Sequence, residues 1–472
     1  MKTFYWYDYE TFGISPRTDR IAQFAGIRTD ENLNILDQHM FYCQPTHDAL
    51  PAPEACAVTG ISPQLCAQKG LNEHAFIRKI NTEFTQPNTC VVGYNSIRFD
   101  DEFTRHTLYR NFLDPYAWHW QNGNTRWDIL DVVRLCYALK KEQSLNWVYD
   151  DETGNPVFKL DRLAPANGIE HTNAHDALAD VRATIALAKI IQQTQPKLFD
   201  YAFGLRQKKT VEKNLTLFEP ILHTSGMYGA QNSCTRLAVP IAYHPNYGDR
   251  ALVFNLDQDP SILLALETDE LKTLMFTKQS ELPEGVERLQ IKELIFNKSP
   301  MFVPKVYKLD PAIVKQLGLD MDLCLQHLEF IKANQAQLSQ VVAALYQEEG
   351  ERTPSTDVDQ SLYDGFIEPA DRAICNQVQT LDESALANFH PKFKDTKLST
   401  LLMHFKARNY PDTLTEDEME DWFEVVQGRV QAGENGYRSL DEYEQSLTQM
   451  RALHPDKAQL WQDLADYGES FL

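Results

Sequence analysis

The amino-acid sequence predicts an α/β domain, followed by a strand-rich α+β domain and then a helical, strongly acidic domain. Strand-like and helix-like segments alternate as far as about Lys197, a pattern that is typical of an α/β domain. After Gln195 and Pro196, strand-like segments such as ALVFNLD precede helical sequence. Near the end of the chain, patterns such as DEYEQSLTQMRALH indicate acidic helices. A chain of 472 residues is also too long for a single hydrophobic core.

The first domain begins with the strand-like segment FYWYDYETFG and ends with a long amphipathic helix. Between them we expect a helix near 73–84 and a buried strand at CVVGYN. In the last helix, apolar residues recur at helical spacing, and Asn173 is the expected N-cap. These apolar positions are Leu178, Val181, Ile185, Ala188 and Ile191.

Two breaks in the pattern separate the domains. The dipeptide Gln195-Pro196 ends the first domain, and EEGERTPSTDVDQ, near 348–360, is polar, contains a proline and is a candidate linker. The domains are therefore expected at residues 1–196, 197–350 and 351–472.

Composition and charge limit the classes of function. The start of the chain lacks the apolar run of a signal peptide, and no stretch approaches the roughly 20 apolar residues of a membrane span. Eight cysteines occur without a C-x-x-C pair, so we expect reduced thiols and no thiolate zinc site. The formal net charge of −22 means that a nucleic-acid partner would need a localised basic channel. We expect a cytoplasmic monomer that does not enter a membrane.

Asp8 and Glu10 are the first candidates for chemistry. Strand periodicity places Phe4, Trp6, Asp8 and Glu10 on one face, where two carboxylates project together beside aromatic rings. In an acidic chain, a D-x-E pair is most often a solvated surface pair. The aromatic strand favours the alternative, because buried carboxylates are costly and usually bind a metal or another cation.

The second candidate segment is GYNSIRFDDEF. Helical geometry makes Phe99 and Phe103 an inward stripe, with Asp100 at its edge and Asp101 pointing roughly opposite. Asp100 is therefore the better ligand candidate. The alternative is that both aspartates only favour the helix N-terminus through its dipole.

The third candidate segment, NAHDALAD, contains His175 and Asp180 with an H-x4-D spacing. His171 and Asp176 give a second match to the same spacing, so this pattern alone leaves the choice open. On its own, His175 is more simply a histidine at the start of a helix.

Together these segments supply four carboxylates, Asp8, Glu10, Asp100 and Asp180, with His175 as a titratable imidazole. Carboxylate oxygens suit Mg²⁺ or Mn²⁺. Two such ions can hold the attacking and the leaving oxygen of a phosphodiester, and an imidazole can take the proton from the attacking water. The set therefore predicts a hydrolytic phosphodiesterase.

The same segments resemble the three motifs of the DEDDh exonuclease superfamily. Further segments, among them TRWDILDVVRLCYAL, TSGMYGA and LYDGF, are similar to the bacterial exonuclease I family over essentially the full length. The resemblance selects the frame of His175 and Asp180. It implies a ribonuclease H-like exonuclease domain, an SH3-like barrel domain and a C-terminal all-α domain.

The resemblance also implies processive 3′-to-5′ hydrolysis of single-stranded DNA to 5′-mononucleotides, in DNA repair and recombination. Asp8, Glu10, Asp100 and Asp180 would hold two Mg²⁺ ions, for which Mn²⁺ can substitute, and His175 would be the general base. The matched substrate positions are Glu10, Arg105, Tyr116, Trp120, Arg134 and Lys159. At Lys159 the family has an arginine, so the bidentate fork is lost while the charge is kept.

A partner is implied as well: the acidic C-terminal tail of single-stranded DNA-binding protein. Lys140, Tyr201 and Lys332 match positions of the family's basic ridge for this tail, whereas Asp310 stands where the family is basic. Two other aromatic residues have two possible roles. Trp118 and Trp127 could be functional aromatic residues or could equally be core residues.

Two other functions compete with the DNA exonuclease. A DEDDh exonuclease acting on RNA shares the same catalytic residues, although the additional domains favour DNA. A non-catalytic single-strand DNA-binding protein would use the acidic cluster only as structure, and the full set of five catalytic-type residues argues against it.

Overall fold

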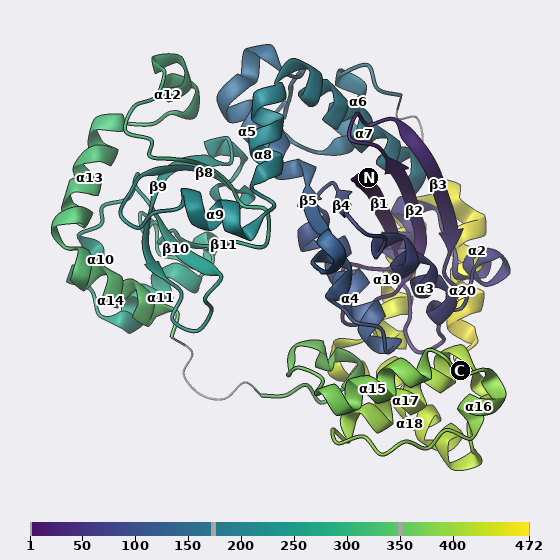
Figure 1. Cartoon of the computed structure of the whole chain (residues 1–472). Helices are drawn as coiled ribbons and strands as arrows, with labels where there is room; N and C mark the ends of the chain where they lie inside the picture. The colour runs from purple at the N-terminus through teal and green to yellow at the C-terminus, as the bar shows by residue number, and fades with distance from the viewer. Residues whose placement is uncertain (1, 171–175, 348–352, 472) are drawn as a thin grey trace. The chain divides into compact units, whose positions relative to one another are not determined.

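The computed structural model describes residues 2–170, 176–347 and 353–471. The chain divides into two compact units, and Figure 1 labels most of their helices and strands. The first unit comprises Met1–Thr125, His171–Arg182 and Arg352–Leu472, and the second comprises Arg126–Glu170 and Ala183–Glu351. Most of the N-terminal α/β segment and the C-terminal helical segment therefore belong to one unit.

The first unit is built on a mixed β-sheet centred on β1 (Thr3–Thr11). β2 (Ile21–Thr29) pairs with β1 antiparallel, and β4 (Thr89–Gly93) pairs with it parallel. β3 (Ile35–Tyr42) continues the sheet beside β2, and the strand order is β3-β2-β1-β4-β5, with β5 at Thr125–Asp128. The mixed sheet confirms the predicted α/β class.

The two faces of β1 differ in what they carry. Tyr5, Tyr7 and Tyr9 pack with Phe76 and Phe84 of α3 (Glu73–Phe84) in one hydrophobic core. Side chains alternate along a strand, so Asp8 and Glu10 project from the opposite face. The aromatic face thus attaches β1 to the core and leaves the acidic face for the site.

Helix α4 (Asp100–Arg110) follows the short 3-10 helix η1 (Ser96–Arg98) at the end of β4. Every residue of α4 except Glu102 is buried. The other helices of this part are α1 (Pro53–Thr59), α2 (Pro63–Lys69) and the start of α7 (Ala177–Thr194), with the short 3-10 helix η2 at Ala117–His119.

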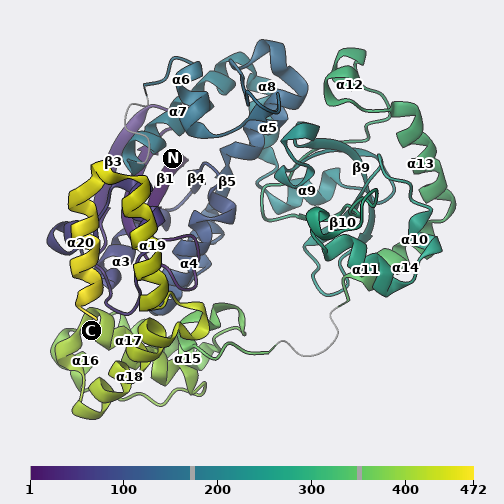
Figure 2. The same cartoon turned by 180° about the vertical axis from the view of Figure 1, so that it is seen from behind.

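The C-terminal segment of the first unit is helical, as predicted. α19 and α20 pack their apolar residues, including Tyr443 and Leu464, with Phe12, Cys56 and Cys66 of the N-terminal segment, and Figure 2 shows both helices in yellow. The helices are α15 (Pro369–Val378), α16 (Glu383–Ala387), α17 (Lys397–Asn409), α18 (Glu416–Ala432), α19 (Leu440–Leu453) and α20 (Ala458–Glu469).

The predicted linker near 348–360 is wrong from Asp357 onward. Asp357, Asp359 and Gln360 are buried, and the 3-10 helix η8 occupies Val358–Tyr363. Arg429 donates hydrogen bonds to both aspartates, so the polar residues are neutralised inside the protein and not solvated. Residues 348–352 lie outside the described part of the chain.

The second unit contains an antiparallel sheet of five strands in the order β11-β10-β9-β8-β12. Its core joins Leu252 and Phe254 of the sheet with Leu328 of α13 (Met321–Ala333) and Val342 of α14 (Gln335–Leu345). This arrangement confirms the α+β class. The strands are β8 (Ile221–Thr224), β9 (Thr235–Tyr243), β10 (Arg250–Asn255), β11 (Ile291–Ile295) and β12 (Met301–Pro304).

The second unit also contains a small hairpin, several α-helices and the part of α7 from Ala183 onward. Apart from α7, these are β6 (Val148–Tyr149), β7 (Pro156–Val157), α5 (Ile129–Lys140), α6 (Leu160–Ala166), α8 (Pro196–Gly204), α9 (Lys208–Asn214), α10 (Ile262–Ala265), α11 (Thr268–Phe276), α12 (Pro311–Leu317), α13 (Met321–Ala333) and α14 (Gln335–Leu345). Among the described residues, no helix is both long and apolar enough to span a membrane.

Candidate nuclease and metal site

Three of the predicted carboxylates meet in the first unit. β1 supplies Asp8 and Glu10, and the first turn of α7 supplies Asp180. One ligand atom of each lies within 4.8 Å of those of the other two. Glu10 is buried, while Asp8 and Asp180 are partly buried. Side-chain alternation along β1 places Asp8 and Glu10 on one face, and the start of α7 lies close enough to add Asp180.

Asp100 belongs to the same electrostatic group. It is buried at the start of α4, and its Oδ1 accepts a hydrogen bond from the backbone N–H of Tyr9 at 3.3 Å. That contact ties α4 to β1 between Asp8 and Glu10.

The pKa values of Asp8 and Glu10 are raised. Burial, followed by repulsion from Asp100, Glu10 and Asp180, raises the pKa of Asp8 well above its ordinary value. Burial and the charges of Asp180, Asp100 and Asp176 raise the pKa of Glu10 to about 8. Closely spaced carboxylates cannot all ionise cheaply in such a place unless a cation joins them.

The donor set fits divalent cations. It consists of carboxylate oxygens, which are hard ligands of the kind preferred by Mg²⁺ and Mn²⁺. Charge repulsion between Asp8 and Glu10 would be relieved by a bound cation, so binding and deprotonation would reinforce each other.

Helical geometry had predicted that Asp101 points away from the core, but the structure shows it buried. It is 1% exposed, and its Oδ1 accepts a hydrogen bond from the hydroxyl of Tyr7 at 2.6 Å. The hydroxyl of Tyr9 lies 2.9 Å from that of Thr104 on the same helix. The predicted inward stripe is confirmed, since Phe99 and Phe103 pack in the core with Tyr7 and Tyr9. The outward direction expected for Asp101 was wrong because α4 is buried on nearly all sides.

The predicted general base, His175, lies outside the described residues, as do Asn173 and His171 of the competing frame. Asp176 is described and is partly buried, and its backbone carbonyl accepts a hydrogen bond from the N–H of Asp180 at 3.1 Å. The choice between the two H-x4-D frames therefore stays a prediction.

Besides Glu10, three of the predicted DNA contacts lie in the first unit. Trp120 is 61% exposed, Tyr116 is partly buried and Arg105 is 6% exposed. The guanidinium of Arg105 lies 5.4 Å from the centre of the Tyr116 ring. The exposed indole of Trp120 offers a stacking surface, and Arg105 supplies a positive charge beside the Tyr116 ring.

The other two predicted contacts, Arg134 and Lys159, lie in the second unit. Nη1 of Arg134 donates to Asp131 at 2.7 Å, and its guanidinium lies 5.9 Å from the centre of the Phe158 ring. Lys159 is exposed at the N-cap of α6. Both basic groups are therefore carried at helices of this unit.

Trp118 and Trp127 are core residues, which was one of the two roles considered for them from the sequence. Both are 0% exposed. Trp118 packs with Phe84, and Trp127 packs between Phe199 and Phe203.

The predicted partner residues also lie in the second unit. Lys140 is exposed at the end of α5, and the hydroxyl of Tyr201 donates to the carbonyl of Phe302 at 2.6 Å. Nζ of Lys332 donates to the hydroxyl of Tyr307 at 3.2 Å. Asp310 is exposed, and its side chain caps α12 by accepting from the N–H of Ala312.

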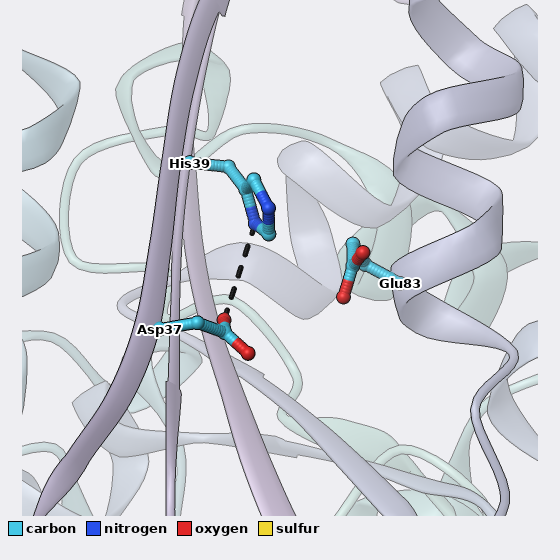
Figure 3. Close-up of side chains that lie close together, drawn as sticks. All are labelled: Asp37, His39 and Glu83. Carbon is cyan, nitrogen blue, oxygen red and sulfur yellow. Dashed lines mark ion pairs between the residues drawn. The ribbon is translucent and has the colours of Figure 1, made fainter.

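A second group of possible metal ligands lies between β3 and α3, where Figure 3 shows Asp37 and His39 on the strand and Glu83 on the helix. An arginine already occupies this place: Arg28 contacts Glu83 at 2.9 Å and Asp37 at 3.6 Å. The guanidinium compensates the two carboxylates, so the electrostatic case for a cation is weaker here than at Asp8.

Sequence reasoning missed two residues beside Arg105. Glu102 pairs with Arg105 at 2.8 Å, and Tyr363 of η8 donates a hydrogen bond to Glu102. LYDGF, which contains Tyr363, is similar to the exonuclease I family, but no local pattern connects it with α4.

Comparisons with known proteins agree with this architecture. Residues 5–188 match the family described as Exonuclease, residues 206–348 the Exonuclease I SH3-like domain, and residues 356–471 the Exonuclease I C-terminal domain. The matched SH3-like domain confirms the class expected for the middle of the chain.

Similar proteins cover the whole chain. Exodeoxyribonuclease I of Haemophilus influenzae is 45% identical over 100% of this chain and 99% of its own length, and that of Escherichia coli is 43% identical over 89% and 88%. The solved structure of E. coli exonuclease I with a dA16 oligonucleotide covers all of both chains at 40% identity, with a TM-score of 0.94. Exonuclease I from Methylocaldum szegediense matches with a TM-score of 0.93 at 41% identity, again over both full chains. This chain therefore belongs to the exonuclease I family.

Proposed function

We propose that this chain is an exodeoxyribonuclease I, which hydrolyses single-stranded DNA from the 3′ end to 5′-mononucleotides, processively, in DNA repair and recombination. The observation that carries the proposal is the meeting of Asp8, Glu10 and Asp180 in one acidic site. Relatives named exodeoxyribonuclease I match along the full chain, and E. coli exonuclease I has been solved with dA16 and dT13 oligonucleotides.

The acidic residues have proposed roles as ligands of divalent ions. Asp8, Glu10, Asp100 and Asp180 would hold two Mg²⁺ ions, with Mn²⁺ as a substitute. The E. coli protein is known in a zinc-bound form with single-stranded DNA. When bound, two such ions supply charge stabilisation for the attacking and leaving oxygens of the phosphodiester.

The chain's own residues would do the rest of the chemistry. His175 would accept the proton of the attacking water as general base. Glu10, on the acidic face of β1, would also contact the terminal nucleotide. The burial of Glu10 and the partial burial of Asp8 would strengthen charge interactions at the scissile bond.

Aromatic and basic residues would hold the strand. Trp120, which is exposed, and Tyr116 would stack on bases without regard to sequence. Arg105, Arg134 and Lys159 would pair with phosphates. Such contacts would supply local positive charge in a chain whose formal net charge is −22.

The test compares end-labelled single-stranded DNA with an RNA oligonucleotide of matched sequence, in Mg²⁺. We expect release of mononucleotides from DNA, starting at the 3′ end. Faster cleavage of RNA would favour the rival nuclease, and binding without any release of mononucleotides would favour a non-catalytic binder. Blocking the 3′ end should stop release if the polarity is as proposed.

The proposal extends to a partner and a setting. Lys140, Tyr201 and Lys332 would bind the acidic C-terminal tail of single-stranded DNA-binding protein, with Asp310 weakening the attraction. We also propose a cytoplasmic monomer, since the eight cysteines are all free and buried, as suits a reducing compartment. Fluorescence anisotropy of a labelled tail peptide against Lys332→Glu tests the partner, and sedimentation tests the monomer.

A further inference from the structure

The surroundings of Arg105 contain a contact that the proposed reaction does not yet use. Nη1 of Arg105 donates to Oε1 of Glu102 at 2.8 Å, and Nη2 lies 3.3 Å from Nε2 of His119. Nε is buried and has no hydrogen-bond partner among the described residues. The guanidinium, with its five N–H donors, therefore has capacity beyond its one carboxylate contact.

The other oxygen of Glu102 is held from the C-terminal segment. The hydroxyl of Tyr363 donates a hydrogen bond to Oε2 of Glu102 and lies 3.5 Å from Nη1 of Arg105. The ring of Tyr363 packs edge-on against His106 at 5.8 Å. The two oxygens of Glu102 thus have different partners, one on its own helix and one from 261 residues away in sequence.

The 3-10 helix η8, which carries Tyr363, is attached to the N-terminal segment by buried ion pairs. Asp357, at the start of η8, and Asp359, within it, both accept hydrogen bonds from Arg429. Arg429 also pairs with Asp48 of the N-terminal segment at 2.7 Å. Because these side chains are buried, the position of Tyr363 relative to α4 is set by a network of charged contacts.

We infer that Tyr363 is a positioning residue for the strand contact proposed for Arg105. A carboxylate beside an arginine can accept two parallel hydrogen bonds from its fork. By holding Oε2, the hydroxyl of Tyr363 restricts Glu102 to a single contact and leaves Nη2 of Arg105 for a DNA phosphate. The inference rests on the proposed function of Arg105.

The test is a double-mutant cycle of Tyr363→Phe and Glu102→Gln, measured on single-stranded DNA in Mg²⁺. Tyr363→Phe removes only the hydroxyl, so both oxygens of Glu102 become free to accept hydrogen bonds from Arg105. We expect KM to rise roughly threefold to tenfold with kcat unchanged. In the Glu102→Gln background the same change should have no further effect on KM, because the competing carboxylate is gone.

Tyr410→Phe is the matched control. Its hydroxyl lies 2.8 Å from Nδ1 of His74, so it is a second tyrosine of the C-terminal segment that contacts the nuclease segment, away from Arg105. It should leave KM unchanged even if its thermal stability falls as far as that of Tyr363→Phe. An equal rise in KM would mean a general effect of segment docking and would overturn the inference.

Two further outcomes would also overturn it. One is an unchanged KM in Tyr363→Phe, and the other is the same rise in the Glu102→Gln background, which would mean that Tyr363 contacts DNA directly. Binding of labelled single-stranded DNA in chelator gives a readout without turnover. A wild-type protein that binds DNA but releases no mononucleotides would reject the proposed function, whereas weaker binding by Tyr363→Phe would still support the positioning role.

Discussion

Two clusters of buried carboxylates lie in the first unit, and they differ in the charges around them. At the nuclease site, burial and neighbouring carboxylates raise the pKa values of Asp8 and Glu10. Asp48 is at least as deeply buried, and burial alone would raise its pKa. Arg20, Arg429 and Arg408 instead hold that pKa below its ordinary value.

The arginine-bound cluster connects the two segments of the unit. Asp359 is buried too, but Arg408, His404 and Arg429 hold its pKa well below the ordinary value. Here the protein supplies its own cations, so the acids serve structure. At Asp8 and Glu10 the groups that shift the pKa values are acids, and a cation from solution would complete the site. The two clusters contain the same types of residue. They differ in role because only one of them has arginines to balance its negative charge.

The largest expected effect is loss of turnover in Asp180→Asn. The substitution keeps the size of the side chain but removes a charged ligand oxygen, so turnover should fall on the order of 10³-fold or more. Single-stranded DNA should still bind in chelator. Mononucleotide release measures the first and fluorescence anisotropy the second.

Asp176→Asn is the control for that change, since Asp176 belongs to the competing H-x4-D frame. It should keep most of its turnover. The reverse result, a loss in Asp176→Asn with Asp180→Asn near normal, would move the site to the other frame.

In the arginine-bound cluster, Arg429→Met should affect stability strongly. It leaves Asp48, Asp357 and Asp359 buried without one of their cations, and we expect the free energy of unfolding to fall by about 3–5 kcal/mol. Urea denaturation measures the change. Lys278→Met, which breaks an exposed pair with Glu281, should cost less than about 1 kcal/mol. Equal effects would show that burial of the network adds nothing.

His175→Ala should slow turnover roughly 10²-fold or more, through loss of the general base. The binding of DNA in chelator should be unchanged. His171→Ala is the matched control and should remain close to wild type. Near-normal turnover in His175→Ala together with a slow His171→Ala would assign the base to the competing frame.

The last expected effect is on the pH dependence of stability, and it has opposite signs at the two clusters. In chelator, the free energy of unfolding should fall as the pH rises from about 4.5 to about 8, because folded Glu10 keeps a proton that the unfolded chain has released. Glu10→Gln should flatten this slope. Mg²⁺ should restore stability at the upper end of the range.

At the arginine-bound cluster the stabilisation is present above pH 3.8, the ordinary pKa of aspartate, and is lost as the pH falls further, because Asp48 and Asp359 must take up protons. Thermal unfolding across both ranges measures the two effects. A wild-type slope that Glu10→Gln leaves unaltered between about 4.5 and 8 would show that Glu10 is ionised at little cost.

Local periodicity carried the sequence predictions that succeeded. Alternation along β1 predicted that Asp8 and Glu10 project together, and the change from alternating elements to strands and then helices predicted the α/β, α+β and helical order. These features depend on the geometry of one strand or one helix, which neighbouring residues determine.

Whether a polar residue is buried depends on contacts with distant residues, which the periodicity of the sequence does not indicate. Asp101 is covered by Tyr7, and the expected linker becomes the buried start of η8 because Arg429 meets Asp357 and Asp359. A helical wheel assumes one buried side and one solvated side, and a polar stretch is assumed to need water. Tertiary packing broke both assumptions.

The sequence by itself determined the acidic strand of the site, the character of each segment and, through resemblance, the family. Only the tertiary structure decided which acids arginines neutralise and that Tyr363 lies at Glu102, 261 residues away. The physical reason is that hydrogen bonds and ion pairs between distant residues depend on how whole elements pack, and no local spacing of residue types records that arrangement.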